Sequence, residues 1–342
     1  MATNVSEKKA KRKLFKGNKP NGSTPLRGKK SRVSQMTKLK RTEYWKGMIG
    51  KIVAYAILLA FSYIFLYPLL SMFSMSFMSQ ADLINPDVNW IPRSFSLNNF
   101  KVAGQVLTMP QSMINSVWVS VLFALAQTVV STLTGYAFAK FKFPGRGFLF
   151  VMLLLSFIIP VPLVTIPRVM VFTTLQDLTS IQMIGTIIPQ FFFSILGQGV
   201  NSAILILICY NFFNGIPPAL DEAASIDGAN SRQIFWHITI KLSVSTIVTA
   251  FLFAFVWNWN ETYSTSTFIR TGVDLLPQRL GIFESVFAQR GAELSTDGGG
   301  EARVNEAYKM AGTLISITPL LILYFFTQRL FIEGIENVGI KG

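Results

Sequence analysis

The stretch Ile52–Phe73 reads IVAYAILLAFSYIFLYPLLSMF and contains no charged residue. A helix that crosses the hydrocarbon core of a bilayer needs about 20 consecutive apolar residues, so this stretch is long enough to span. A signal peptide is a poor alternative, because the basic segment before the stretch is too long and no small-residue cleavage site follows it. The stretch therefore predicts a transmembrane helix that stays in the protein.

The rest of the chain repeats this pattern. Hydrophobic residues make up 51% of the 342 residues and charged residues only 14%, whereas soluble proteins carry roughly a quarter charged residues. The apolar residues fall into six stretches, at residues 52–73, 113–138, 147–171, 183–213, 243–263 and 310–331. We therefore predict an all-α, polytopic membrane protein with six transmembrane helices.

Several of these stretches contain residues that interrupt helices. The third and fourth contain Pro160, Pro162, Pro167, Pro189, Gly197 and Gly199. Broken helices tend to line a cavity or to pack against partners, because freed backbone groups need hydrogen-bond partners away from lipid. The alternative is that glycine and proline are simply commoner in membrane helices than in soluble ones.

The net charge of +14 comes from one end of the chain. Residues 1–51 hold 16 Lys and Arg against 2 acidic residues, and the remainder is neutral. Such a polar segment cannot bury enough apolar surface to fold alone, so we expect residues 1–50 to be a disordered tail attracted to anionic lipid headgroups. No nucleic-acid-binding fold accompanies the charge, so we expect no nucleic-acid partner.

The basic residues near the span ends predict the orientation. Lys and Arg accumulate in cytoplasmic segments, and the short loop 139–146 contains Lys140, Lys142 and Arg146 without an acid. The loop 172–182 contains Asp177 and neither Lys nor Arg. Six spans then place both termini and the loop 214–242 in the cytoplasm, and they place 74–112 and 264–309 outside.

The loop 214–242 contains PPALDEAASIDGANSRQIFW at Pro217–Trp236. Two prolines can open a helix at its first turn, and Asp221 and Glu222 come early, where the helix dipole favours negative charge. Gly228 can then end that helix. We predict two short helices that form a helix–turn–helix elbow (residues 217–238), which projects from the membrane.

This elbow resembles the EAA motif of ABC-importer permeases. In that motif Glu-Ala-Ala is followed by three residues, Gly, nine residues and Ile-x-Leu-Pro. Glu222-Ala223-Ala224 and Gly228 match, and Ile238 has the expected spacing. Ile240 and Lys241 stand where Leu and Pro are usual, so the junction with the fifth span departs from the pattern.

The flanking sequence resembles the carbohydrate-importer permeases similar to the smaller maltose permease subunit. The matching segments are Gly135–Arg146 (GYAFAKFKFPGR), Ile166-Pro167, Trp259-Asn260-Glu261 and Gln328–Gly334 (QRLFIEG), followed by Lys341-Gly342. The resemblance covers about residues 51–342. It implies a six-span permease domain at 51–331 with a coupling (EAA) loop at 214–242, and a cytoplasmic tail at 332–342. It also implies location in a bacterial plasma (inner) membrane.

The resemblance implies that the elbow docks on a separate ATPase. The residues expected to do so are Asp221, Glu222, Ala223, Ala224, Asp227, Gly228, Arg232 and Phe235. The implied partners are a second permease subunit, two ATP-binding subunits and an external solute-binding protein. ATP and Mg²⁺ would be bound by the ATPase subunits, and we expect no cofactor, metal or catalytic site in this chain. Its closest approach to a phosphate-binding loop, residues 22–30, has the wrong glycine spacing.

Two segments are candidates for contact with a substrate or binding protein. Trp257, Asn258 and Asn260 gather at the end of the fifth span, and rings and amides are the groups that hold sugars. Anchoring at the membrane interface is the alternative role of such aromatic residues. In the loop 264–309, Gly298-Gly299-Gly300 indicates either a flexible surface loop or, from the resemblance, a segment that reaches into the binding protein.

Two other functions remain open. An ABC permease for a non-sugar solute, such as a peptide or amino acid, would share the elbow but fewer of the flanking matches. A secondary transporter would need an intramembrane acid for ion coupling, and Glu261, at a span end, is a poor candidate. An ATPase that purifies with the chain would exclude the secondary transporter.

Overall fold

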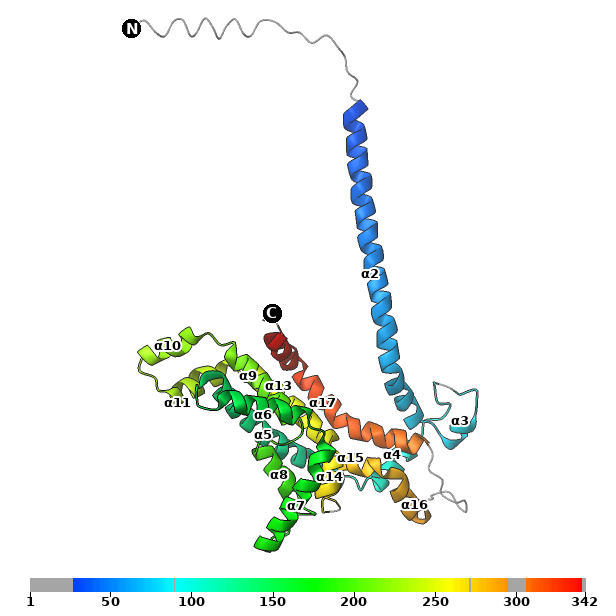
Figure 1. The fold of residues 1–342 in the computed structure, drawn as a ribbon. Coiled ribbons are helices and arrows are strands. Elements are labelled where there is room, and N and C mark those ends of the chain that lie inside the picture. Colours follow the sequence, from blue (N-terminus) through cyan, green and yellow to red (C-terminus); the bar gives the residue numbers. More distant parts are fainter. Residues whose placement is uncertain (1–26, 89, 271, 295–305, 340–342) are drawn as a thin grey trace, which may run out of the picture. The chain divides into compact units, whose positions relative to one another are not determined.

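The computed structural model describes residues 27–88, 90–270, 272–294 and 306–339, and these contain helices and no strand (Figure 1). The predicted all-α class is therefore confirmed. The chain divides into two units, Met1–Pro68 and Leu69–Gly342. The helices are α2 (Arg27–Ser76), α3 (Gln80–Ile84), α4 (Asn98–Val106), α5 (Gln111–Lys140), α6 (Arg146–Ile158), α7 (Val161–Thr179), α8 (Ile188–Ile195), α9 (Ser202–Asn214), α10 (Pro218–Ile226), α11 (Ser231–Ile234), the π-helical turn η1 (Phe235–Thr239), α12 (Ile240–Leu242), α13 (Val244–Asn260), α14 (Tyr263–Phe268), α15 (Leu276–Gly281), α16 (Phe283–Leu294) and α17 (Glu306–Gly339).

The two terminal helices are longer than the predicted spans. In α2, residues Met48–Ser76 are long and apolar enough to cross a membrane, and they include the predicted span 52–73. The helix begins at Arg27, inside the segment expected to be a disordered tail, and residues 1–26 lie outside the described part. Once an apolar segment has nucleated a helix, each further residue adds a hydrogen bond at little cost, and Lys and Arg are good helix formers. Likewise, α17 continues past residue 332, where the C-terminal tail was expected to begin.

Among the residues that the structure describes, three helical segments qualify as spans by length and composition, and up to six do so if each bent helix pair counts as one span. The three are Met48–Ser76, Gln111–Lys140 and Glu306–Arg329. The bent pairs are Arg146–Ile158 with Val161–Thr179, at 106°, Ser202–Asn214 with Pro218–Ile226, at 64°, and Ser231–Leu242 with Val244–Asn260, at 74°.

The predicted third and fourth spans are both broken. The third turns at Ile159, which is extended because the ring of Pro160 disfavours helical geometry in the residue before it. Pro167, in contrast, lies inside α7. The fourth breaks between α8 and α9, where Gly197 has φ +69°.

The centre of the second unit is α5, which packs against α9 and α13. A Cβ on Gly135 would lie 2.6 Å from the Cβ of Cys209 and 2.8 Å from the backbone nitrogen of Tyr210, so α5 and α9 approach each other closely at this point. Small and hydroxyl-bearing residues line these contacts, as is common between membrane helices. Those buried include Ser131, Thr132, Ala203, Thr246, Thr249, Ala250 and Ala254.

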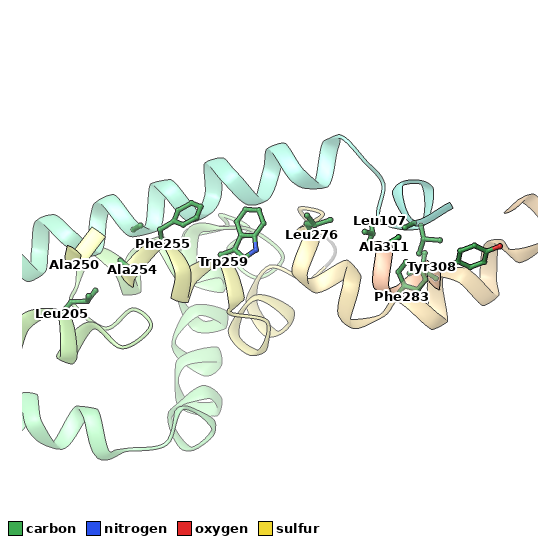
Figure 2. Packing of buried hydrophobic residues seen from close by; sticks show 14 of the residues in the cluster. Leu107, Leu205, Ala250, Ala254, Phe255, Trp259, Leu276, Phe283, Tyr308 and Ala311 are labelled. Carbon is green, nitrogen blue, oxygen red and sulfur yellow. The ribbon is translucent and has the colours of Figure 1, made fainter. Parts of the chain in front are cut away.

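The buried apolar cluster follows α13 and continues into the shorter helices. Figure 2 shows Leu205 of α9 beside Ala250 and Ala254 of α13, with Phe255 and Trp259 further along α13. The cluster then passes through α15 to a group formed by Leu107, Phe283, Tyr308 and Ala311. Because one cluster joins these elements, both ends of α5 are tied to the same core.

The two ends of α5 contact different loops. Near its start, the Ser116 hydroxyl accepts a hydrogen bond from the Leu276 backbone N–H at 2.7 Å. At its end, the Lys140 ammonium contacts the segment that follows α9. These two points are about 36 Å apart along the helix, which exceeds the ~30 Å hydrocarbon core of a bilayer. The start of α15 and the elbow therefore lie toward opposite ends of α5.

Candidate functional site

The first helix of the elbow, α10, has an almost entirely exposed surface. Pro217 is its N-cap and Pro218 occupies its first turn. A backbone N–H at that position has no partner within the helix, so proline is tolerated there. None of its residues is buried, and Ile226 is 87% exposed. The exposed residues are Pro218, Ala219, Leu220, Glu222, Ala223, Ser225 and Ile226. This mixture of apolar and acidic side chains on a short projecting helix is suited to contact with a partner.

The turn between the elbow's helices is fixed on both sides. Gly228 has φ +85°, and its N–H donates to the Ser225 carbonyl, while the Ala229 N–H donates to the Ala224 carbonyl. This is the Schellman pattern that ends helices at a glycine. Asn230 then begins α11 with a capping box, in which its side chain and that of Gln233 each accept the other's backbone N–H, at 2.9 and 2.8 Å.

The second helix of the elbow enters α13 through a π-helical turn and a bend. In η1, the Ile240 N–H donates to the Phe235 carbonyl, five residues earlier. At the bend, the Ser243 hydroxyl donates to the Thr239 carbonyl at 2.8 Å. The junction thus turns by 74° without the proline that is usual in the resembled motif. Lys241 takes that proline's place with an exposed side chain inside the short α12.

An ion pair connects the elbow to α5. The Lys140 ammonium donates to Asp221 Oδ2 at 2.7 Å and to the Ile216 carbonyl at 3.2 Å. The two side chains are 14% and 28% exposed, so the pair is largely shielded from solvent. An aromatic contact lies nearby, where the rings of Tyr136 and Phe235 are 4.7 Å apart. The ion pair and the ring contact therefore connect the elbow directly to the end of α5.

The structure separates the predicted docking residues into exposed and internal positions. Glu222, Ala223, Asp227, Gly228 and Arg232 are exposed, and Ala224 is half-buried. Asp221 faces Lys140, and Phe235 is only 8% exposed and packs on Tyr136. Asp221 and Phe235 therefore attach the elbow to α5, a role that spacing alone could not reveal because their partners lie on a distant helix.

The residues expected to line a substrate path also divide. The Trp257 ring stacks on Phe253 at 5.3 Å, and Asn260 is exposed and donates to its own helix at the Val256 carbonyl. Neither lines the main cavity. Asn258 does, and its side-chain nitrogen donates to Gln127 Oε1 and to the Ala254 carbonyl. Gln127 is fully buried and also donates to Ser202 Oγ at 2.8 Å, so Asn258 belongs to a network that joins α5, α9 and α13.

The main cavity has a volume of about 300 Å³ and lies among α6, α7, α8, the start of α9 and the end of α13. The larger polar side chains that line it are Arg168, Gln190, Gln198, Asn201, Asn258 and Glu261. The broken helices thus border a cavity with polar groups in its wall, as the first interpretation of their Pro and Gly residues predicts. Arg168 and Gln190 were missed from the sequence, although an arginine inside the apolar stretch 147–171 was a visible signal.

Comparison with known proteins gives the family and the fold. Residues 127–337, more than half of the chain, match the family described as binding-protein-dependent transport system inner membrane component. The chain is 27% identical over 267 residues to the probable starch degradation products transport system permease protein AmyC of Thermoanaerobacterium thermosulfurigenes, covering 78% of this chain and 88% of the relative. It is 27% identical over 299 residues to the polygalacturonan/rhamnogalacturonan transport system permease protein YtcP of Bacillus subtilis (strain 168), covering 87% and 100%.

A solved structure has the same fold. It is a crystal structure of a bacterial ABC transporter involved in the import of the acidic polysaccharide alginate. The TM-score is 0.62 at 23% identity, over 83% of this chain and 96% of the matched chain.

Proposed function

The chain belongs to the binding-protein-dependent transport system inner membrane component family, and we propose that it is a permease subunit of an ATP-driven importer for a sugar or oligosaccharide. The family consists of membrane transport subunits, not of enzymes. The carbohydrate substrate is supported by the names of relatives, which refer to starch degradation products and to polygalacturonan/rhamnogalacturonan. The matches in the flanking sequence also support a carbohydrate substrate.

The observation that carries the coupling part of this proposal is the geometry of the elbow. Glu222, Ala223 and Ile226 are exposed on α10, and the turn that follows this helix is fixed by Gly228 and Asn230. We propose that this surface enters a cleft of an ATP-hydrolysing subunit. Closure of two such subunits on ATP would push α10, and the Lys140–Asp221 pair would pass the displacement to α5.

The remaining subunits are those that the family resemblance implies. A second, different permease would complete the path, and an external binding protein would deliver the sugar. The elbow would face the cytoplasm together with both termini, and ATP and Mg²⁺ would be held by the ATPase subunits. Alternation between inward- and outward-facing states would then move the substrate past the cavity lined by Asn258.

A charge reversal on the elbow tests the proposal. Glu222→Lys changes an exposed acid of α10, and Asp177→Lys makes the same change on an exposed acid at the end of α7. The two variants and the wild type are expressed with the partner subunits, and ATPase subunit recovered with the tagged permease is measured. We expect a large loss for Glu222→Lys and recovery close to wild type for Asp177→Lys.

A backbone variant provides a second test of the same surface. A Cβ would meet no atom within 4 Å at either Gly228 or Gly281, but only Gly228 has a positive φ. Gly228→Ala costs roughly 1–2 kcal/mol of turn stability, so it should weaken ATPase stimulation, while Gly281→Ala should not. Normal ATPase recovery and stimulation in both Glu222→Lys and Gly228→Ala would refute docking through the elbow.

A further inference from the structure

Few charged residues line the main cavity, and no ion pair joins the ones that the structure describes. Arg168 is the one cation among its lining residues and Glu261 the one carboxylate. Glu261 Oε1 accepts the Ser264 backbone N–H at 2.7 Å, and Arg168 forms no ion pair within the described part of the chain. The cavity therefore contains a positive charge that its own acid does not neutralise.

Arg168 is held in place, but not all of its N–H donors have a hydrogen-bond partner in the described structure. Its guanidinium lies over the Phe193 ring, 4.4 Å from the centroid, and Nη2 donates to the carbonyl and side-chain oxygens of Gln198 at 3.3 and 3.4 Å. An arginine has five N–H donors in a planar fork, and both of these bonds use the same nitrogen. A charged residue within a membrane-spanning segment is costly, so one that faces a cavity without a counter-ion indicates a functional site.

A second, independent group in the cavity has a hydrogen-bond acceptor without a partner. Gln190 is 6% exposed, and its Oε1 is buried without a hydrogen-bond partner among the residues described. Both hydrogen bonds of Asn258 are made by Nδ2, which leaves its Oδ1 available to a ligand. Amides of this kind suit the hydroxyl groups of a sugar, and an unpaired buried acceptor is expensive unless a ligand or water satisfies it.

We propose that this cavity is a binding site for one acidic sugar unit, whose carboxylate pairs with Arg168 while its hydroxyls contact Gln190 and Asn258. This proposal rests on the proposed function as a sugar permease. The guanidinium fork matches a carboxylate in geometry as well as in charge. The volume of about 300 Å³ is at the lower end for small-molecule sites, so it suits a single unit better than a longer chain.

The test measures equilibrium binding to the assembled transporter in lipid nanodiscs, without the external binding protein. The probes are digalacturonate, of which the cavity would hold one unit, and its neutral counterpart, digalactose. Arg168→Gln removes the charge, Arg168→Lys keeps the charge but loses the fork, and Arg93→Gln is the matched control on an exposed arginine outside the cavity. Complex yield and ATPase activity without sugar show whether each variant assembles.

We expect the wild type and Arg93→Gln to prefer digalacturonate. Arg168→Gln should weaken digalacturonate binding by roughly tenfold to a hundredfold, as for loss of a charge-assisted hydrogen bond, and should leave digalactose nearly unchanged. The affinity of Arg168→Lys for digalacturonate should lie between that of the wild type and that of Arg168→Gln. Equal binding of the two probes by the wild type, or an unchanged preference in Arg168→Gln, would overturn the proposal.

Two further outcomes distinguish sugar binding from lipid binding and from failed assembly. An anionic lipid headgroup could also reach Arg168, so the measurements are made in discs of phosphatidylcholine alone and in discs with phosphatidylglycerol. Arg168-dependent retention of phosphatidylglycerol, without digalacturonate binding in either disc, would replace the sugar by a lipid and overturn the proposal. Failure of the permease to assemble with an ATPase would instead refute the proposed function, before any sugar is added.

Discussion

Lys140 and Asp221 are 81 residues apart in the sequence, yet their side chains form the connection between α5 and the elbow. Removal of one partner leaves a poorly solvated charge, since Asp221 Oδ1 is already buried without a hydrogen bond. We expect Lys140→Met or Asp221→Asn to weaken the packing of α10 by about 1–3 kcal/mol. Hydrogen exchange of the α10 amides in the purified protein measures this loss.

A double variant distinguishes the ion pair from general damage. Replacement of both partners by apolar residues, as in Lys140→Met with Asp221→Leu, removes the unpaired charge as well as the attraction. We expect exchange in α10 to return most of the way to the wild-type rate. Losses that simply add in the double variant would show that the two side chains do not act as a pair.

Individual residues also show what sequence reasoning could reach. The EAA resemblance selected Glu222 and Gly228, which lie on the exposed part of the elbow, because their spacing along one short segment defines both. It selected Asp221 and Phe235 for docking as well, but their partners, Lys140 and Tyr136, come from a distant helix. Arg168 was detectable as a charge in an apolar stretch, whereas its place in a cavity that Glu261 also lines required the fold.

At the scale of helices, α5 and α9 approach each other closely at Gly135. In a helix interior, Gly→Ala normally stabilises by up to about 1 kcal/mol. At Gly135 the new Cβ would lie 2.6 Å from Cys209 Cβ, so overpacking should reverse the sign and cost about 1–3 kcal/mol. We expect Gly135→Ala to lower the melting temperature of the detergent-purified protein.

The matched control is Gly50→Ala, in the interior of α2, where a Cβ meets no atom within 4 Å. It should show no loss of stability. If Gly135→Ala is as stable as Gly50→Ala, the two helices are not in tight contact at this point.

Helix positions were largely predictable because hydropathy determines which segments can enter a membrane. The predicted stretches 113–138 and 310–331 lie within α5 and α17. The predicted stretches 147–171 and 183–213 are each divided, at Pro160 and around Gly197, and the bend of 106° between α6 and α7 could not be inferred. A proline removes a backbone donor, but the direction of the next helix depends on what it packs against.

At the scale of the whole second unit, the contacts between loops fall into two groups. Lys140, Asp221 and Phe235 meet at one end of α5. At the other end, the Asn115 side chain donates to the Asp274 carbonyl at 3.1 Å. The Gly185 N–H donates to the Phe268 carbonyl at 2.7 Å, so residues before α8 contact the end of α14. These contacts thus form one group at each end of α5.

The sidedness of these groups is testable, because Cys209 is the one cysteine of the chain and is buried. In a Cys209→Ala background, Ser180→Cys places a thiol on the loop 172–182, and Ser225→Cys places one on the exposed surface of α10. The excess of Lys and Arg in the tail and in the loop 139–146 predicts that the elbow faces the cytoplasm. A membrane-impermeant maleimide added to intact spheroplasts should therefore label Ser180→Cys and leave Ser225→Cys unlabelled until the cells are permeabilised. Labelling of Ser225→Cys in intact spheroplasts would invert the topology and place the elbow out of reach of any cytoplasmic ATPase.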